Sequence, residues 1–205
     1  MSNETSQQPA TGLVDAAGAA SPEPALEADA ALMLRVGAGD HGALRTLIER
    51  WQGPLLNFFY RSVRSMQTSE DLAQTVFIRI YRNAATYVPS ARFSTYLFHV
   101  ARNVLINEHR RRVRKPAEPF DPADFNMENA ASGDDASARS CAEIEEAFSR
   151  AILELTESQR TAILLHKQQE LSYEEIAAVM EASVPLVKSW IFRGRLRLKA
   201  LLKDL

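Results

Sequence analysis

The sequence predicts an all-α protein with two small helical domains joined by a flexible acidic linker. Apolar residues recur at intervals of three and four in both halves of the chain, which is the period of an amphipathic helix. No stretch alternates apolar and polar residues as a half-buried strand does, and no internal repeat is visible. A segment rich in proline and acidic residues separates the two helical patterns. We therefore expect a disordered N-terminal tail, a first domain, a linker and a second domain, over residues 1–28, 29–115, 116–140 and 141–205.

The composition is that of a globular protein and gives no sign of a cofactor or metal. Apolar residues make up 46% of the 205 positions, and no apolar run approaches the ~20 residues that span a bilayer. No basic segment followed by an apolar core opens the chain, so we expect no signal peptide and a cytoplasmic location. The single cysteine, Cys141, excludes an intramolecular disulfide, and the four histidines are scattered.

The net charge of −2 conceals an uneven distribution of charge along the chain. Residues 35–115 hold fourteen basic and five acidic side chains, whereas residues 1–34 hold five acidic and no basic ones. The segment 116–140 holds six acidic residues and a single arginine. The last segment is acidic through Glu181 and basic from Lys188. Such asymmetry favours nucleic-acid contact that is confined to particular faces.

The first helices follow a tail that is rich in alanine, serine and proline and contains no aromatic residue. This tail cannot bury enough apolar surface to offset the entropy of ordering, so we expect it to be disordered. A helical pattern begins at Asp29 and ends at Gly37–Gly39. Asp40 is placed to cap the next helix, which extends to about Arg64. Pro54 should kink this helix without ending it, because the apolar period resumes beyond it.

The third and fourth helices complete the first domain. Thr68–Asp71 carries a capping signature, followed by an inner face that includes Phe77 and Tyr81. Ser94 or Thr95 is expected to cap the fourth helix. This helix ends in a run of basic residues, and Pro116 stops it. Cations near a helix C-terminus favour the helix dipole, but five bases in six residues exceed what a cap requires.

The second domain is expected to end in two short helices with a tight turn between them. Thr156 with Gln159, and Ser172 with Glu175, are two successive capping boxes. The turn falls at Glu181–Ser183, and the final helix has Pro185 in its first turn. The polar positions of that helix are largely basic. An apolar helix followed by a basic one is typical of a helix-turn-helix, whose second helix enters the DNA major groove. The alternative is a basic, solvated helix in an ordinary bundle.

Taken together, the helical segments resemble the extracytoplasmic-function (ECF) group of the sigma-70 family of initiation factors. Ser69–Arg82 is similar to the region-two helix that docks on the polymerase β′ coiled coil, and Phe93–Arg110 resembles the promoter-melting helix. Leu155–Arg160 and Leu171–Arg195 resemble region four, which reads the minus-thirty-five element. The resemblance covers roughly residues 30–115 and 141–203. Glu181 departs from the family pattern, since glycine often stands at this turn position.

The resemblance, joined to residue chemistry, assigns candidate contacts to three helices. Asparagine amides both donate and accept hydrogen bonds and therefore suit base edges, while arginines hold phosphates. The minus-ten candidates are Arg92, Arg102, Asn103, Asn107, Arg110 and Arg111, with the loop Tyr87–Arg92 as a base-specificity loop. The minus-thirty-five candidates are Lys188, Ser189, Arg193, Arg195 and Arg197. The candidates for docking on core polymerase are Glu70, Asp71, Gln74, Phe77 and Arg79.

The implied function is that of a dissociable sigma factor that directs core RNA polymerase to promoters and aids their opening, in a stress or envelope-signal response. Its implied partners are the β and β′ subunits of core polymerase, promoter DNA and an anti-sigma factor. We expect no enzymatic activity, no small-molecule substrate and a monomer when the protein is free. Two alternatives are a helix-turn-helix regulator that acts without polymerase docking, and an adaptor that does not transcribe. The polymerase-docking pattern argues against the first.

Overall fold

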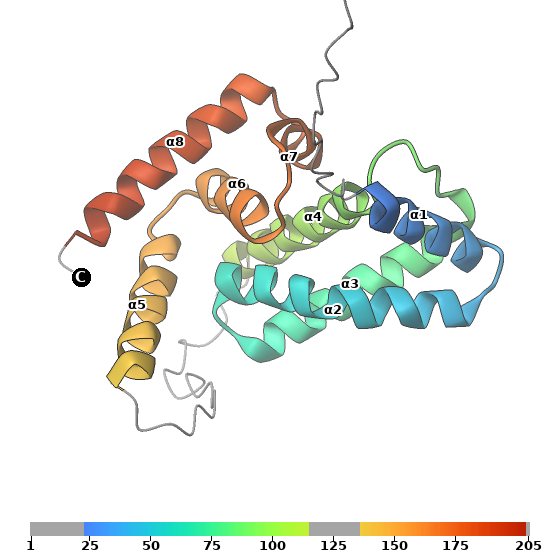
Figure 1. Cartoon of the computed structure of the whole chain (residues 1–205), viewed down its shortest axis with the longest axis horizontal. Helices are drawn as coiled ribbons and strands as arrows, with labels where there is room; N and C mark the ends of the chain where they lie inside the picture. The colour runs from blue at the N-terminus through green and yellow to red at the C-terminus, as the bar shows by residue number, and fades with distance from the viewer. Residues whose placement is uncertain (1–22, 115–135, 204–205) are drawn as a thin grey trace, which may run out of the picture.

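The computed structural model describes residues 23–114 and 136–203, and these residues are helical without any strand. The described part therefore confirms the all-α class (Figure 1). The helices are α1 (Glu23–Gly37), α2 (His41–Val63), α3 (Met66–Asn83), the short 3-10 helix η1 (Ala84–Thr86), α4 (Phe93–Arg114), α5 (Ala136–Leu153), α6 (Glu157–Gln168), α7 (Tyr173–Met180) and α8 (Val184–Leu201). None of the described helices is long and apolar enough to cross a membrane.

Helices α1 to α4 pack around one apolar core. Each contributes side chains at helical spacing, so that one face of each helix is buried. Trp51 closes one side, where its indole Nε1 donates to Asp29 at 3.1 Å and its ring lies edge-on to Phe98. Asp29 is buried and also pairs with Arg50. The largest buried side chains of this half are Met33, Leu47, Leu55, Phe58, Phe59, Ile80, Phe93, Leu97 and Phe98.

Helices α6, α7 and α8 form the second half, with α5 packed at its edge. The expected capping boxes at Thr156 and Ser172 are both present, and each satisfies backbone N–H groups at a helix start. Helix α8 crosses α6 closely at Gly194, where an added Cβ would lie 2.5 Å from Cδ1 of Ile163. The buried stripe of α8 is Val187, Ile191, Gly194 and Leu198. The helix-turn-helix expected from the sequence is therefore formed by α7 and α8.

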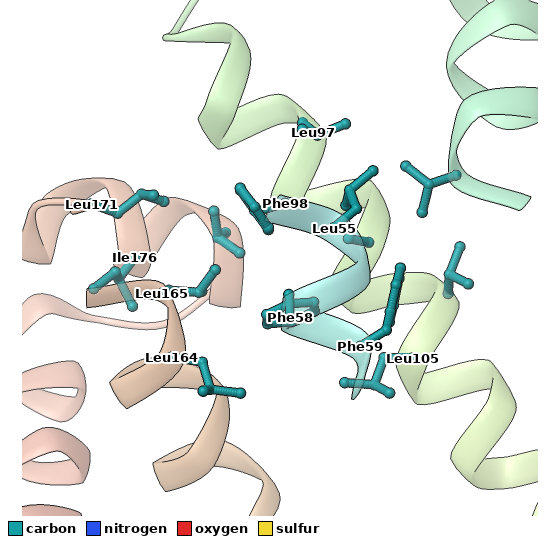
Figure 2. Close-up of a cluster of buried hydrophobic side chains, with 14 of the residues drawn as sticks. Leu55, Phe58, Phe59, Leu97, Phe98, Leu105, Leu164, Leu165, Leu171 and Ile176 are labelled. Carbon is teal, nitrogen blue, oxygen red and sulfur yellow. The ribbon is translucent and has the colours of Figure 1, made fainter. Parts of the chain in front are cut away.

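The two halves lie against each other and share one hydrophobic cluster. Helix α7 packs on α4, and α6 packs on α2 (Figure 1). In Figure 2, Phe58 and Phe98 occupy the side of the first half that faces Leu165 and Leu171. All four of these side chains are at most 2% exposed. The arrangement places the turn of the helix-turn-helix next to the fourth helix.

Several helix boundaries differ from the sequence-based expectation. Helix α1 begins at Glu23, so residues 23–28, expected in the tail, are helical. Helix α5 begins at Ala136, before the expected end of the linker. Ser65 caps α3, ahead of the expected Thr68–Asp71 signature. The predictions of a disordered tail and a flexible linker otherwise fall on residues 1–22 and 115–135, which lie outside the described residues.

The start of α4 was predicted incorrectly. Because α4 begins at Phe93, Ser94 and Thr95 lie inside its first turn and are buried. Phe93 is 1% exposed and fills the core, so packing of this ring sets the helix start in place of a hydroxyl cap. Ser183 stands at the N-cap of α8, but its side chain makes no capping hydrogen bond.

Candidate nucleic-acid interface

The outer face of α4 carries both asparagines of the predicted minus-ten set. Asn103, Asn107 and Arg110 recur at intervals of four and three, so they share the side opposite the buried stripe. Asn107 and Arg110 are exposed, whereas Asn103 is half-buried. Nδ2 of Asn103 lies 3.4 Å from Nε2 of His99, one turn earlier. The two amides therefore lie on one side of α4, and Asn103 already has a polar neighbour there.

A basic cleft lies beside this face, between α4 and the start of α6. Its volume is about 460 Å³. Arg102 and Arg110 of the predicted set both line it, together with His109 and Arg114. Glu157 and Ser158 of α6 form the opposite wall. Three guanidinium groups in one open cleft make it suited to phosphate groups.

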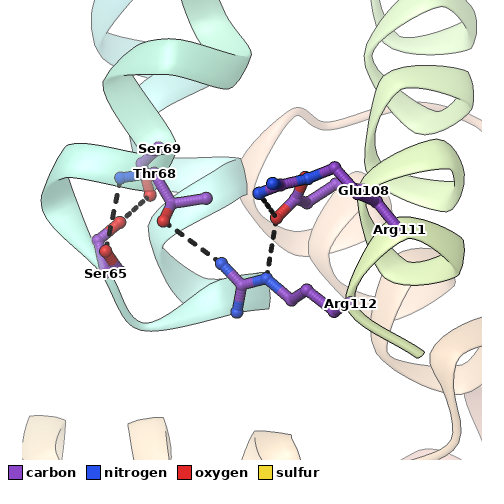
Figure 3. A network of polar contacts seen from close by, with 6 residues as sticks. All are labelled: Ser65, Thr68, Ser69, Glu108, Arg111 and Arg112. Carbon is purple, nitrogen blue, oxygen red and sulfur yellow. Dashed lines mark hydrogen bonds and ion pairs between the residues drawn. The ribbon is translucent and has the colours of Figure 1, made fainter. Parts of the chain in front are cut away.

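Arg111 lies apart from the other predicted contacts because it is held by Glu108 (Figure 3). Its guanidinium donates two hydrogen bonds to that carboxylate, of 2.7 and 2.9 Å. Arg112 donates to the same carboxylate at 2.8 Å and to the Thr68 hydroxyl at 3.1 Å. The hydrogen bonds from Arg111 and Arg112 lower the pKa of Glu108 although its burial opposes this. Arg111 therefore ties α4 together, and Arg112 links α4 to α3.

The predicted specificity loop contains a small cavity lined by aromatic and hydroxyl side chains. The rings of Tyr87 and Tyr96 lie 5.0 Å apart, and the cavity between α4 and the loop measures about 160 Å³. The Tyr87 hydroxyl and the Thr95 hydroxyl are buried and have no hydrogen-bond partner. Burial raises the pKa of Tyr87, so this phenol stays protonated and can donate. Ala178 of α7 also lines the cavity.

Arg92, at the end of this loop, is paired with the second half of the molecule. Its Nε lies 3.2 Å from Oε1 of Glu175 on α7. The Arg92 side chain is 42% exposed and the Glu175 side chain is 17% exposed. Glu175 also completes the Ser172 capping box, so one carboxylate serves both contacts. The structure therefore places Arg92 beside the predicted minus-ten helix, with its charge already partly neutralised.

Helix α8 presents the predicted minus-thirty-five residues over a wide arc. Ser189 and Arg193 lie opposite the buried stripe, and Arg195 and Arg197 are exposed along its flanks. The ammonium of Lys188 sits 5.4 Å from the centre of the Tyr173 ring, a cation–π contact within the helix-turn-helix. The sequence analysis missed Phe192 and Leu196, which are 64% and 53% exposed on the outer side. The sequence did contain a signal for this exposure, because Phe192 and Leu196 are apolar but do not fall at the buried positions of the helix.

Helix α3 brings most of the predicted docking residues to one exposed side. Glu70, Asp71 and Gln74 are exposed, and Phe77 is half-buried against the core. Arg79 falls on another side of the helix. Tyr81 was expected on the inner face and is instead 46% exposed, as Ile78 is at 49%. Tyr81 stays outside the core because Val76 and Ile80 fill the space that α3 faces within the bundle.

This arrangement is suited to binding anions and bases. The described residues contain no group of three or more histidine, cysteine or acidic side chains that could hold a metal ion. The basic cleft, the hydroxyl-lined cavity and the asparagine face adjoin one another along α4. The exposed cations of α8 form a second basic surface.

Comparison with known proteins gives two family matches that divide the chain in the same way as the structure. Residues 47–115 match Sigma-70 region 2, and residues 145–198 match Sigma-70, region 4. The RNA polymerase sigma-H factor of Pseudomonas aeruginosa is 34% identical over 177 residues, covering 82% of this chain and 91% of its own. The ECF RNA polymerase sigma factor SigW of Bacillus subtilis is 30% identical, covering 83% and 95%. The ECF RNA polymerase sigma-E factor of Escherichia coli is 31% identical, covering 82% and 90%.

Two solved structures share the fold. CnrH in complex with the cytosolic domain of CnrY has a TM-score of 0.62 and 22% identity, covering 86% of this chain and 98% of that chain. The sigma factor RpoE in complex with the anti-sigma factor NepR, from Bartonella quintana, has a TM-score of 0.64 and 23% identity, covering 78% and 96%.

Proposed function

Because the chain belongs to the extracytoplasmic-function group of the sigma-70 family, we propose which of its surfaces contact promoter DNA and which contacts core polymerase. As a sigma factor, it directs core RNA polymerase to specific promoters and aids their opening when transcription starts. Membership of this group fits a stress or envelope-signal response. We place its action in the cytoplasm, with polymerase, and assign it no enzymatic reaction.

We assign minus-ten recognition to the outer face of α4 and the loop before it. The observation that carries this assignment is a pair of buried hydroxyls without partners, next to the asparagine face of α4. Asn103 lies beside His99, which lines the cavity in which the Tyr87 and Thr95 hydroxyls lack partners, and Asn107 follows one turn further along α4. A base turned out of the duplex would supply the missing hydrogen bonds, and a ring could stack against the tyrosines. We assign the neighbouring phosphates to Arg102 and Arg110, which both line the basic cleft.

We assign minus-thirty-five anchorage to α8 and polymerase docking to α3. The exposed cations Arg193, Arg195 and Arg197 support the first assignment, since arginine binds both phosphates and guanine edges. Glu70, Asp71 and Gln74 with the exposed Ile78 and Tyr81 support the second, because they combine charge with apolar area on one helix. The expected domains, residues 29–115 and 141–205, would then carry one DNA element each.

We also propose that an anti-sigma factor controls this protein. Among the structural neighbours, RpoE was solved with the anti-sigma factor NepR, and CnrH was solved with the cytosolic domain of CnrY. Their likeness to this chain shows the fold alone. Co-purification from the native cell tests the proposal, and it should recover the inhibitor together with core polymerase.

Reconstituted transcription tests the proposed function. Core polymerase plus this protein should start transcripts at defined sites on fragments of the native genome. Asn103→Ala/Asn107→Ala should reduce open-complex formation and alter the preferred minus-ten sequence. Asn57→Ala, at an exposed asparagine of α2, is the matched control and should leave both unchanged. Normal opening and unchanged preference in the double variant would remove these asparagines from base recognition.

A further inference from the structure

We propose that the packing of α7 on α4 is an autoinhibitory contact, in which Glu175 and Glu181 occupy the promoter-facing side of α4 as internal substitutes for DNA phosphates. The inference rests on the proposed role of α4 in minus-ten recognition. It adds that the free protein covers this surface with its own helix-turn-helix. Three features of the contact support it: the partners of the two glutamates, the backbone of Glu181 and the cavity beneath α7.

The first glutamate neutralises a predicted DNA contact. Oε1 of Glu175 lies 3.2 Å from Nε of Arg92, and the carboxylate is only 17% exposed. A phosphate would be bound by Arg92 through the same N–H donor. The Nε–H cannot point at both anions, so Glu175 competes with a phosphate for this donor and partly neutralises the charge of Arg92.

The second glutamate reaches the asparagine face. Oε1 of Glu181 lies 3.1 Å from Nε2 of His99, and the same nitrogen lies 3.4 Å from Nδ2 of Asn103. A carboxylate only accepts hydrogen bonds, so His99 is the donor in this pair. The pKa of Glu181 is lowered first by this hydrogen bond and further by the charges of His99 and Arg102. Glu181 is therefore a negative charge placed among the groups predicted to receive promoter DNA.

The backbone at Glu181 adopts a conformation that costs energy for any residue except glycine, although the side chain makes a contact that glycine could not. Glu181 has φ 51 and ψ 46, a left-handed conformation that favours glycine. Glycine would fit this turn without strain but would bring no carboxylate to His99. A positive φ of 52 also occurs at Glu170, which makes no polar contact to α4 among the described residues. Comparing the same substitution at Glu170 and Glu181 therefore separates the effect of backbone strain from the effect of the contact with α4.

The cavity and the apolar cluster show that α7 also covers part of the surface of α4. Ala178, between the two glutamates, lines the hydroxyl-bearing cavity with Tyr87 and Tyr96. Behind it, Phe98 joins the buried cluster that spans both halves. Helix α7 therefore covers part of the cavity that we assign to a flipped base, and its departure from α4 would widen access to that cavity. Glu175 and Glu181 lie at the rim of this interface, where their contacts stabilise the packing of α7 on α4 without burying either charge completely.

The experiment compares two double variants of the full chain. Glu175→Gln/Glu181→Gln removes both carboxylates, and the first substitution retains the capping box because glutamine serves equally at that position. Glu170→Gln/Glu174→Gln is the control: it removes the same charge from the same half of the molecule, at exposed residues that make no hydrogen bond or ion pair with α4 in the described part of the chain. The probe is a fluorescent, mixed-sequence, single-stranded DNA of about 20 nucleotides, longer than one single-strand binding site. Small-angle scattering of each free protein measures its radius of gyration.

The proposal predicts a larger radius of gyration and roughly threefold to tenfold tighter DNA binding for the Glu175/Glu181 variant than for the control, from two ion pairs of ordinary strength. Glu181→Gly should shift both readouts in the same direction, whereas Glu170→Gly, which relieves the same backbone strain, should not. Equal scattering and equal affinity in the variant and its control would overturn the proposal. Failure of the wild-type protein to start transcription with core polymerase would instead count against the proposed function, because the scattering result does not depend on a promoter.

Discussion

The guanidinium of Arg160 donates a hydrogen bond of 3.1 Å to the backbone carbonyl of Ser62, 98 residues earlier in the chain. The same guanidinium donates to the carbonyls of Ile152, Leu153 and Leu155 at 2.8 to 3.1 Å. It thereby caps the end of α5 and joins α6 to the end of α2. Burial lowers the pKa of Arg160, but an arginine remains charged at any physiological pH.

Replacing Arg160 should therefore destabilise both the second half and its contact with the first. Arg160→Met keeps most of the length of the side chain but removes the guanidinium hydrogen bonds to four carbonyls, of which Ile152 O still accepts from the Leu155 N–H. We expect a loss of about 2 kcal/mol in the free energy of unfolding, measured by urea denaturation, since partly buried carbonyls that lose their hydrogen bonds are costly. Arg150→Met, at an exposed arginine of α5 that pairs with Glu146, is the control and should change stability by less than about 0.5 kcal/mol. Equal effects of the two substitutions would contradict the structural role.

Glu108 predicts a pH dependence of stability. Its pKa is lowered in the folded protein by the hydrogen bonds from Arg111 and Arg112, so the carboxylate form stabilises the fold. This contribution is fully present above the carboxyl's ordinary pKa of 4.5 and is lost as the pH falls through the lower folded value. Glu108→Gln should cost about 1 kcal/mol at pH 7, and the difference from the wild type should shrink below about pH 4.5. A constant difference in thermal midpoint from about pH 7 to about pH 3 would count against this account.

Phe192 is expected to contact thymine in the minus-thirty-five element. Its ring is 64% exposed on the side of α8 opposite the buried stripe, and apolar side chains recognise the thymine methyl group in the major groove. Phe192→Ala should weaken binding to the promoter duplex about tenfold. Replacing thymine with uracil in that element should weaken the wild type but not the variant. Leu201→Ala, at the far end of the same helix, should bind both duplexes like the wild type.

Ile78 and Tyr81 are expected to strengthen docking on core polymerase. Both are nearly half exposed on α3, next to the acidic and polar side chains predicted to make that contact. Ile78→Ala/Tyr81→Ala should weaken affinity for core polymerase about tenfold or more, measured by fluorescence anisotropy, while folding is preserved. Val113→Ala, at an apolar side chain of α4 that is 73% exposed, provides the control. Unchanged affinity of the α3 variant would place docking on another surface.

Local signals in the sequence predicted most of the helices and several of their ends. The capping boxes at Thr156 and Ser172 and the cap at Asp40 all form as expected. The four-residue spacing of Asn103 and Asn107 likewise places both on one face of α4. These features depend on residues three or four positions apart, and such distances are set by the helix itself. The start of α4 was missed because Phe93 is placed by packing, which is not a local property.

By itself, the sequence determined the helical class, the helix-turn-helix and the family, because periodicity, caps and motif order are encoded along the chain. Only the tertiary structure decided which charged groups are available on its surfaces. Arg112 donates to Thr68, Arg92 pairs with Glu175, and Glu181 reaches His99 across 82 positions of sequence. The energy of a charge depends on its neighbours in space and on its exposure to water, and residues far apart in the chain set both. For this reason the basic residues were identifiable from sequence, but their present partners were not.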